Sequence, residues 1–115
     1  MHSCSVNPSD TYMSRGVYGK VEGKETVGIG FEGAGEVIQV SKDLDPSLVG
    51  KKVALSNNYG IPGYEGTWRQ YIHVKKELLM FYPDEADYDL MSYSYVNPLT
   101  VCCFQFLIEK HGYKA

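Results

Sequence analysis

Tyrosine is the chemically active side chain that this 115-residue sequence offers most often, whereas potential metal ligands are few and scattered. His2, His73 and His111 lie far apart and lack the spacing of a metal-binding motif. The three cysteines cannot form an ordinary disulfide framework, so reduced thiols are expected. A tyrosine hydroxyl held in a cleft can stabilise a developing oxyanion and supply a proton. The sequence therefore points away from metal-dependent chemistry, whereas its abundant tyrosines do not by themselves single out a proton donor.

A glycine-rich segment contains the spacing G-x-G-x-x-G at Gly28, Gly30 and Gly33. A dinucleotide-binding loop with this spacing follows a strand and opens a helix. Here the next residues, 36–40, are alternating and β-branched, which predicts a strand instead. We therefore reject the dinucleotide-binding loop and expect these glycines to permit a close backbone approach or a bulge.

Composition and charge restrict the class of protein. The net charge of −3 provides no basic field, so neither nucleic acid nor a membrane surface is an expected partner. The sequence shows no apolar run near the roughly 20 residues of a membrane span and no secretory signal pattern, which favours a cytoplasmic or mitochondrial protein. Twelve glycines and ten tyrosines suit a single β-rich domain with many tight turns.

Short strands separated by turns dominate the predicted elements. Alternation predicts the clearest strand over 67–74, where every second side chain shares one face. Further strands are expected at 36–40 and 78–82, and a turn followed by a strand is expected within 48–55.

Two helical segments are predicted. Ser9 or Asp10 could cap a short helical turn near the N-terminus. Asn97 is a good N-cap with Pro98 at the first helical position, an apolar run follows, and Gly112 offers a C-terminal stop. Because this second helix is apolar nearly all round, we expect it to be heavily buried. Little sequence is left to cover it, which suggests that the chain is part of something larger.

Five segments match the motifs of one superfamily in order and spacing. They are N-P-S-D-T-Y-M at 7–13 with the following R-G and Y-G, G-F-E-G-A-G-E-V at 30–37, V-G-K-K-V-A at 49–54, G-T-W-R-Q-Y at 66–71 and V-N-P-L-T at 96–100. On these motifs the chain resembles the medium-chain dehydrogenase/reductases, in their zinc-free branch of quinone oxidoreductases and 2-enoyl thioester reductases. Together the five motifs are far more specific than any one alone.

The resemblance implies a mainly β fold with a C-terminal helix, namely a GroES-like, partly open β-barrel that is incomplete here. Residues 1–96 would form this catalytic domain, with its opening strands missing before Met1. Residues 97–115 would form the helix that leads into a Rossmann domain, which is absent. We therefore expect a fragment or a truncated gene product that is inactive alone.

The resemblance also implies hydride transfer from NADP(H) to a quinone or an activated C=C bond, followed by protonation. It assigns the catalytic role of proton donor to Tyr18. The positions that it places at the cofactor are Asn7, Asn97 and Thr100, and those at the substrate are Asp10, Tyr12 and Tyr18. The expected partner is a small molecule, and the full-length enzyme is expected to be a homodimer.

Zinc is not expected as a cofactor. In the zinc-dependent relatives a cysteine and a His-Glu pair help to hold the metal, and the matching positions here are Asn7 and Phe31, with Glu32 alone retained. Phenylalanine cannot ligate zinc, which requires nitrogen, sulfur or carboxylate donors.

Two alternatives remain open. The parent protein could be a trans-2-enoyl-CoA or acyl-carrier-protein reductase, because the Y-G at 18–19 and the G-T-W-R at 66–69 suit that group. The chain could instead be a non-catalytic binding or assembly module that kept the barrel, with the helix at 99–108 exposed as a docking surface.

Overall fold

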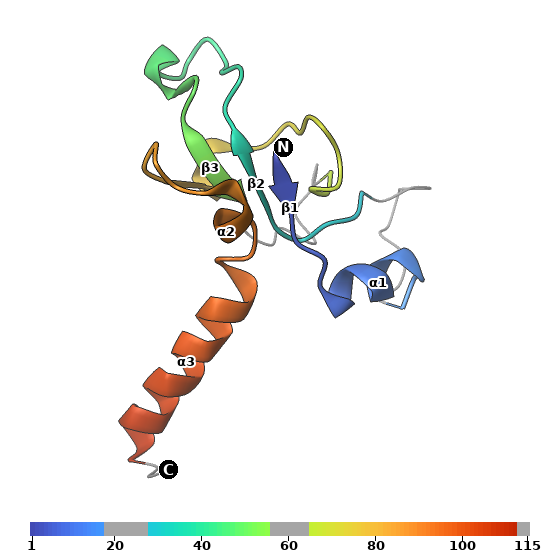
Figure 1. Ribbon diagram of the computed structural model, residues 1–115, viewed down its shortest axis with the longest axis vertical. Helices are drawn as coiled ribbons and strands as arrows, with labels where there is room; N and C mark the ends of the chain where they lie inside the picture. Colours follow the sequence, from blue (N-terminus) through green and yellow to red (C-terminus); the bar gives the residue numbers. More distant parts are fainter. Residues whose placement is uncertain (18–27, 56–64, 113–115) are drawn as a thin grey trace.

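The fold is built on an open antiparallel sheet. The computed structural model describes residues 1–17, 28–55 and 65–112. Its four strands lie in the order β1 (Ser3–Cys4), β2 (Gly33–Glu36), β3 (Lys52–Leu55) and β4 (Leu79–Phe81), each antiparallel to its neighbour. Among these described residues the sheet does not close into a barrel (Figure 1). The predicted mainly β fold with an open sheet and a C-terminal helix is confirmed.

The hydrophobic core lies where small residues of the sheet meet a short helix. Ala34 of β2 pairs with Ala54 of β3, which in turn pairs with Met80 of β4. Met91 of helix α2 (Tyr88–Ser92) belongs to the same buried cluster as the two alanines. Because alanine side chains are small, they leave room for the helix to pack closely on the sheet.

Helix α1 (Pro8–Ser14) follows β1 and has Asn7 at its N-cap. Pro8 occupies the first helical position, where a backbone N–H is not needed. The Asp10 carboxylate accepts a hydrogen bond from the backbone N–H of Asn7 at 2.7 Å. The expected short helix is present, but its cap is Asn7 rather than Ser9 or Asp10, because Asp10 already lies in the first helical turn.

Strands β3 and β4 lie within the ranges predicted for them. The strand predicted at 36–40 is wrong in position, because β2 ends at Glu36. Pairing continues one residue further, because the Val37 N–H donates to the Lys51 carbonyl at 3.0 Å and the Gly50 N–H donates to the Val37 carbonyl at 2.8 Å. In the described part of the chain, residues 38–40 belong to no paired strand.

The segment 67–74, predicted as the clearest strand, is irregular. Its first two residues donate backbone hydrogen bonds to Gly30 and Ile29, and the described pairing then ends. Residues 68–71 are all exposed, so the alternation there does not mark a buried face. Alternation specifies a strand only where one face is buried, which explains the error.

The glycines at 28–35 permit a close backbone approach, as predicted. A Cβ atom added at Gly28 would lie 1.6 Å from the carbonyl oxygen of Glu65. Gly66 has a φ of +75°, and a Cβ atom there would lie 2.3 Å from the carbonyl oxygen of Ile29. Any larger residue at Gly28 or Gly66 would force the two backbone segments apart.

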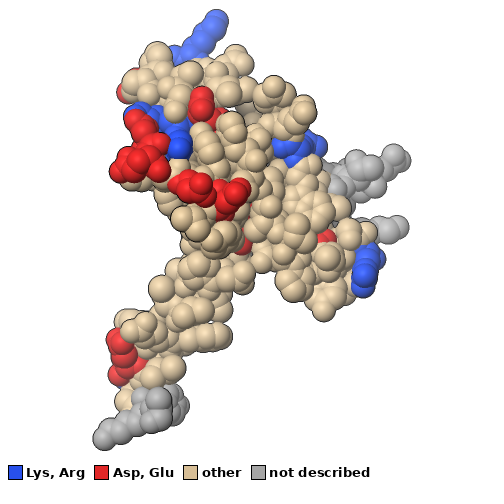
Figure 2. Space-filling view, viewed as in Figure 1, with Lys and Arg blue, Asp and Glu red and all other residues tan. Residues whose placement is uncertain are grey.

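Helix α3 (Val96–His111) projects away from the sheet (Figure 1). It begins two residues before the predicted start, with Tyr95 rather than Asn97 at the N-cap, and Gly112 caps its C-terminal end as predicted. The prediction of a heavily buried helix is wrong, since none of its residues is buried. Apolar content leads to burial only when another element covers the helix. Figure 2 shows a largely uncharged surface along α3, and no described helix is long and apolar enough to cross a membrane.

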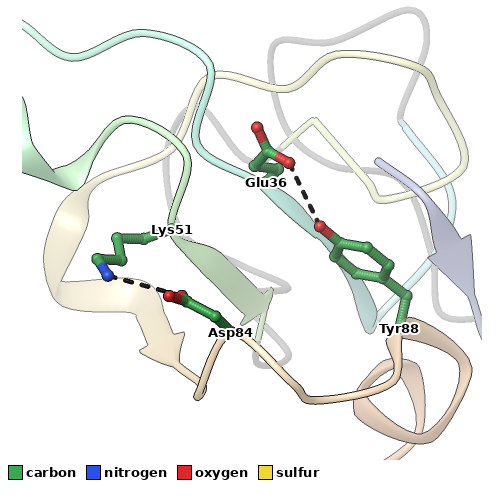
Figure 3. A network of polar contacts seen from close by, with 4 residues as sticks. All are labelled: Glu36, Lys51, Asp84 and Tyr88. Atoms are coloured by element: carbon green, nitrogen blue, oxygen red, sulfur yellow. Dashed lines mark hydrogen bonds and ion pairs between the residues drawn. The ribbon is translucent and has the colours of Figure 1, made fainter.

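A polar network holds α2 against the sheet (Figure 3). The Tyr88 hydroxyl donates to Glu36 Oε2 at 3.4 Å, and its ring stacks on that of His2 with 4.3 Å between the centroids. Lys51 and Asp84 form an ion pair at 3.6 Å. Desolvation and the Glu36 carboxylate raise the pKa of Tyr88. The Tyr88 contacts tie α2 to the sheet, whereas the Lys51–Asp84 ion pair joins the segment before β3 to the segment after β4.

Candidate functional site

A buried carboxylate, Glu32, joins three parts of the chain. It lies just before β2 and is 1% exposed. Its Oε1 accepts hydrogen bonds from Asn7 Nδ2 at 3.1 Å and from the Ser5 hydroxyl at 3.3 Å. Its Oε2 accepts the backbone N–H of Val96, the first residue of α3, at 2.9 Å. We call this cluster, formed by Ser5, Asn7, Glu32, Val96 and Asn97, the junction.

The side chains of Asn7 and Asn97 meet at the junction. Asn97 Nδ2 donates to Asn7 Oδ1 at 3.0 Å, across 90 positions of sequence. Asn7 is buried, whereas Asn97 is exposed. Among the described residues, Asn97 Oδ1 and the second N–H of its amide have no protein partner, so they can bind a ligand. Two of the three residues predicted at the cofactor therefore lie side by side.

Asp10, predicted to border the substrate, is fully buried. Its Oδ1 accepts the backbone N–H of Phe31 at 2.9 Å, and its Oδ2 accepts that of Asn7 at 2.7 Å. Both carboxylate oxygens thus bind main-chain amides, and the residue ties α1 to the segment before β2. These contacts position Asn7, and a direct contact between Asp10 and a substrate stays a prediction.

Tyr12 and Thr100 are both accessible to a ligand. Tyr12 lies on α1 and is 45% exposed. Thr100 is exposed in the first turns of α3, where its hydroxyl donates to the Val96 carbonyl at 2.8 Å and its oxygen can still accept. Tyr18, the predicted proton donor, lies outside the described residues, so its role stays a prediction.

Sequence reasoning assigned no site role to Glu32 or Thr67. Thr67 is fully buried, and its hydroxyl donates to the backbone carbonyl of Glu32 at 2.9 Å. The Cys4 thiol donates to the Thr67 carbonyl at 3.0 Å, and burial raises the pKa of this thiol. Glu32 and Thr67 are the polar residues of the motifs G-F-E-G and G-T-W, and this position within a motif is the signal that could have identified them.

The donors of the junction suit a polar organic ligand rather than a metal ion. Within residues 1–17, 28–55 and 65–112, no group of three or more His, Cys, Asp or Glu side chains could hold a metal. The junction presents amides, a hydroxyl and one carboxylate, and the neighbouring Phe31 carries no donor, so the set does not fit zinc. That the protein works without zinc stays a prediction.

A groove of about 540 Å³ lies elsewhere on the molecule. Its largely apolar lining includes Val37, Leu44, Val53 and Phe81 and contains none of the junction residues. The lining also contains polar side chains. The junction is the better candidate for the functional site, because two of the residues predicted at the cofactor, Asn7 and Asn97, meet there.

The family of this chain follows from its first 84 residues. Residues 1–84 match the alcohol dehydrogenase GroES-like domain. The chain belongs to this family. It is thereby a member of the medium-chain dehydrogenase/reductase superfamily, as the five sequence motifs predict.

A solved structure is also similar to the chain. It is the crystal structure of a candidate NADPH:quinone reductase from Bacillus thuringiensis, with 30% sequence identity and a TM-score of 0.70. The match covers 91% of this chain and 30% of that protein, so the chain spans less than a third of the length of this relative. No curated protein matches the chain significantly.

The junction spans the C-terminal limit of the GroES-like match. Asn7 and Glu32 lie inside the matched residues, whereas Asn97 and Thr100 lie beyond residue 84. The junction therefore connects the GroES-like domain to the helix that follows it. A ligand bound at Asn97 would lie where the two meet.

Proposed function

We propose that this chain is the catalytic-domain part of an NADPH-dependent, zinc-independent oxidoreductase of the quinone reductase type. The observation that carries the proposal is the hydrogen-bonded chain from Asn97 through Asn7 to Glu32, which brings a ligand-accessible amide of α3 against the GroES-like domain. The candidate NADPH:quinone reductase from Bacillus thuringiensis, which is similar to this chain, supports it further.

Asn97 and Thr100 hold the cofactor in this proposal. The bound nicotinamide supplies the hydride to a quinone or an activated C=C bond. Asn97 offers one N–H and one carbonyl oxygen, a pair that complements a primary carboxamide. Thr100 offers a hydroxyl oxygen on the same helix. Asn7 holds the Asn97 side chain in place, and Asp10 holds Asn7 through its backbone.

Tyr12 and Tyr18 bind the substrate, and Tyr18 donates the proton that completes the reduction. A phenol with an ordinary pKa near 10 stays protonated at neutral pH and can donate to a developing oxyanion. Hydrogen bonds of this kind replace the Lewis acid that a zinc ion would supply. The exposure of Tyr12 on α1 leaves its ring accessible to a small molecule.

A chimera tests this proposal. We expect the Bacillus thuringiensis protein, with its matching part replaced by this chain, to oxidise NADPH when a quinone is added. Tyr18→Phe should lower its kcat about 100-fold or more, because a positioned general acid is lost. A chelator should leave the rate unchanged. The unaltered Bacillus thuringiensis protein is the control, and a folded chimera that does not oxidise NADPH beside an active control would reject the proposal.

Calorimetry on the 115-residue chain adds a second test. We expect no tight NADPH binding, because most of the cofactor surface in this superfamily belongs to the Rossmann domain. Micromolar binding would mean that the chain holds the cofactor unaided, through Asn97 and Thr100.

The exposure of α3 favours one alternative, a non-catalytic assembly module. Val101, Phe104 and Phe106 are each at least 60% exposed, and an apolar surface of this kind often binds another protein. An inactive chimera together with stable self-association of the chain would support this alternative. The enoyl reductase alternative predicts that the chimera reduces a 2-enoyl-CoA faster than a quinone.

A further inference from the structure

In the described part of the chain, the Glu32 carboxylate accepts hydrogen bonds from three donors. The donors are the Asn7 NH₂, the Ser5 hydroxyl and the backbone N–H of Val96. An ionised carboxylate only accepts hydrogen bonds, so it suits all of them at once. Because Glu32 is 1% exposed, water cannot easily replace a donor or acceptor that is lost.

This acceptor determines the direction of the two amides that follow. Asn7 must turn its NH₂ toward Glu32, which leaves its Oδ1 facing Asn97. Asn97 must then turn its NH₂ toward Asn7. The direction of the Asn97 amide, and therefore which of its atoms faces a ligand, follows from a side chain that does not touch the ligand.

We propose that Glu32 is a positioning residue that sets the donor–acceptor direction of the Asn7–Asn97 pair and so the groups that Asn97 presents to a carboxamide-bearing cofactor. The inference rests on the proposed function for the cofactor, whereas the amide direction itself stands on the hydrogen bonds. The same carboxylate binds the first N–H of α3, so one side chain sets both the position of the helix and the direction of the amide.

Glu32→Gln tests the amide direction with almost no change in shape. The backbone N–H of Val96 can only donate, so the new glutamine must turn its oxygen to Val96 and its NH₂ to Asn7. Asn7 Nδ2 then meets a donor and keeps only the Ser5 hydroxyl as an acceptor, so we expect the Asn7 amide to reverse. Asn97 must reverse in turn, so that its carbonyl oxygen, rather than its NH₂, faces Asn7.

A second substitution should restore the original direction. In the double variant E32Q/N7D, the glutamine NH₂ donates to the aspartate introduced at position 7, and the second oxygen of that aspartate accepts from Asn97 as before. The double variant exchanges a carboxylate and an amide and keeps the net charge. Ser5→Ala is the control: it removes a donor to Glu32 Oε1 and an acceptor of Asn7 Nδ2, and it leaves the Glu32 carboxylate intact, so the original amide direction should persist.

Nuclear magnetic resonance on the 115-residue chain reads the direction through scalar coupling across the hydrogen bond. We expect coupling from Asn97 Nδ2 to Asn7 Cγ in the unaltered chain and in Ser5→Ala. In Glu32→Gln the coupling should run from Asn7 Nδ2 to Asn97 Cγ. In E32Q/N7D it should run again from Asn97 Nδ2, to the carboxylate carbon at position 7.

Each outcome decides for or against the inference. Glu32→Gln with the original coupling would overturn it, as would an unaltered chain without the coupling. If Glu32→Gln does not fold, the double variant decides: recovery of the fold with the original coupling supports the inference, and failure to fold overturns it. This readout needs no NADPH, so an inactive chimera would reject the proposed function separately. In an active chimera, Glu32→Gln should raise the KM for NADPH about 10-fold, with recovery in the double variant.

Discussion

The junction and the body of α3 combine polarity and burial in opposite ways. At the junction, the Glu32 side chain is almost inaccessible to solvent. The nearby side chains of Asp10 and Thr67 are fully buried. Along α3 the apolar side chains, such as Phe104 and Phe106, are exposed. Residue type alone therefore predicts burial in neither region.

The difference follows from what lies next to each region. Buried polar groups are stable where donors and acceptors meet, and the backbone of the glycine-rich segment and of α1 supplies donors to Asp10. An apolar helix is covered only where another element packs on it. The described chain supplies hydrogen-bond partners for the first region and no covering element for most of the second.

Among the variants that test this contrast, Asp10→Ala should lower the stability of the fold the most. It leaves the buried backbone N–H groups of Asn7 and Phe31 without acceptors, so the free energy of unfolding should fall by about 3–5 kcal/mol. Urea denaturation followed by circular dichroism measures it.

Asp45→Ala is the matched control for Asp10→Ala. Asp45 also accepts a backbone N–H, that of Ser47 at 2.9 Å, but it does so at the exposed start of the turn η1 (Pro46–Leu48). The free energy of unfolding should fall much less in Asp45→Ala than in Asp10→Ala, since water can replace the exposed carboxylate as the acceptor. Equal losses in the two variants would contradict the importance of burial.

Thr67→Val should have the next largest effect. The substitution keeps the shape of the side chain and removes the hydroxyl that donates to the Glu32 carbonyl, so we expect a loss of about 1–2 kcal/mol in the free energy of unfolding. Thr100→Val, at an exposed position on α3, is the control and should change stability much less. A neutral Thr67→Val would show that this hydrogen bond is not needed.

Cys4 provides a smaller effect that depends on pH. Burial raises the pKa of its thiol above the ordinary value of 9.0, so the folded state keeps the proton to higher pH than the unfolded state. The contribution of the Cys4 thiol to the free energy of unfolding is therefore complete below pH 9.0, and it is lost as the pH rises through the pKa of the folded state. Cys4 should also be alkylated more slowly than the exposed Cys102 and Cys103, as peptide mass spectrometry can measure. Equal rates at the three thiols would contradict this.

Phe104→Ser should have the smallest effect. Because Phe104 is 60% exposed, its loss should change the free energy of unfolding by no more than about 0.5 kcal/mol. Met91→Ala, in the buried cluster, is the opposite control and should cost about 2–5 kcal/mol. A large effect of Phe104→Ser in the monomeric chain would mean that α3 packs on the sheet in solution.

Motifs predicted the family and the pairing of segments better than periodicity predicted the elements. The segments that carry Asn7 and Asn97 were assigned to one site from their motifs, and the two side chains are in contact. Alternation at 67–74 failed because residues 68–71 of that segment are all exposed. The capping residue of α3 was missed because the first N–H of the helix is bound by Glu32, 64 positions away, a partner that no local pattern reveals.

The hydrogen bond between Val96 and Glu32 holds the first residue of α3 at the junction, while the rest of the helix extends away from it. At 1.5 Å per residue, the 16 residues of α3 reach about 24 Å from the junction. A tilt of about 10° at the base would move the far end by about 4 Å, which is most of the 5.4 Å pitch of a helical turn. The hydrogen bond from Val96 to Glu32 therefore helps to determine where the far end of α3 lies.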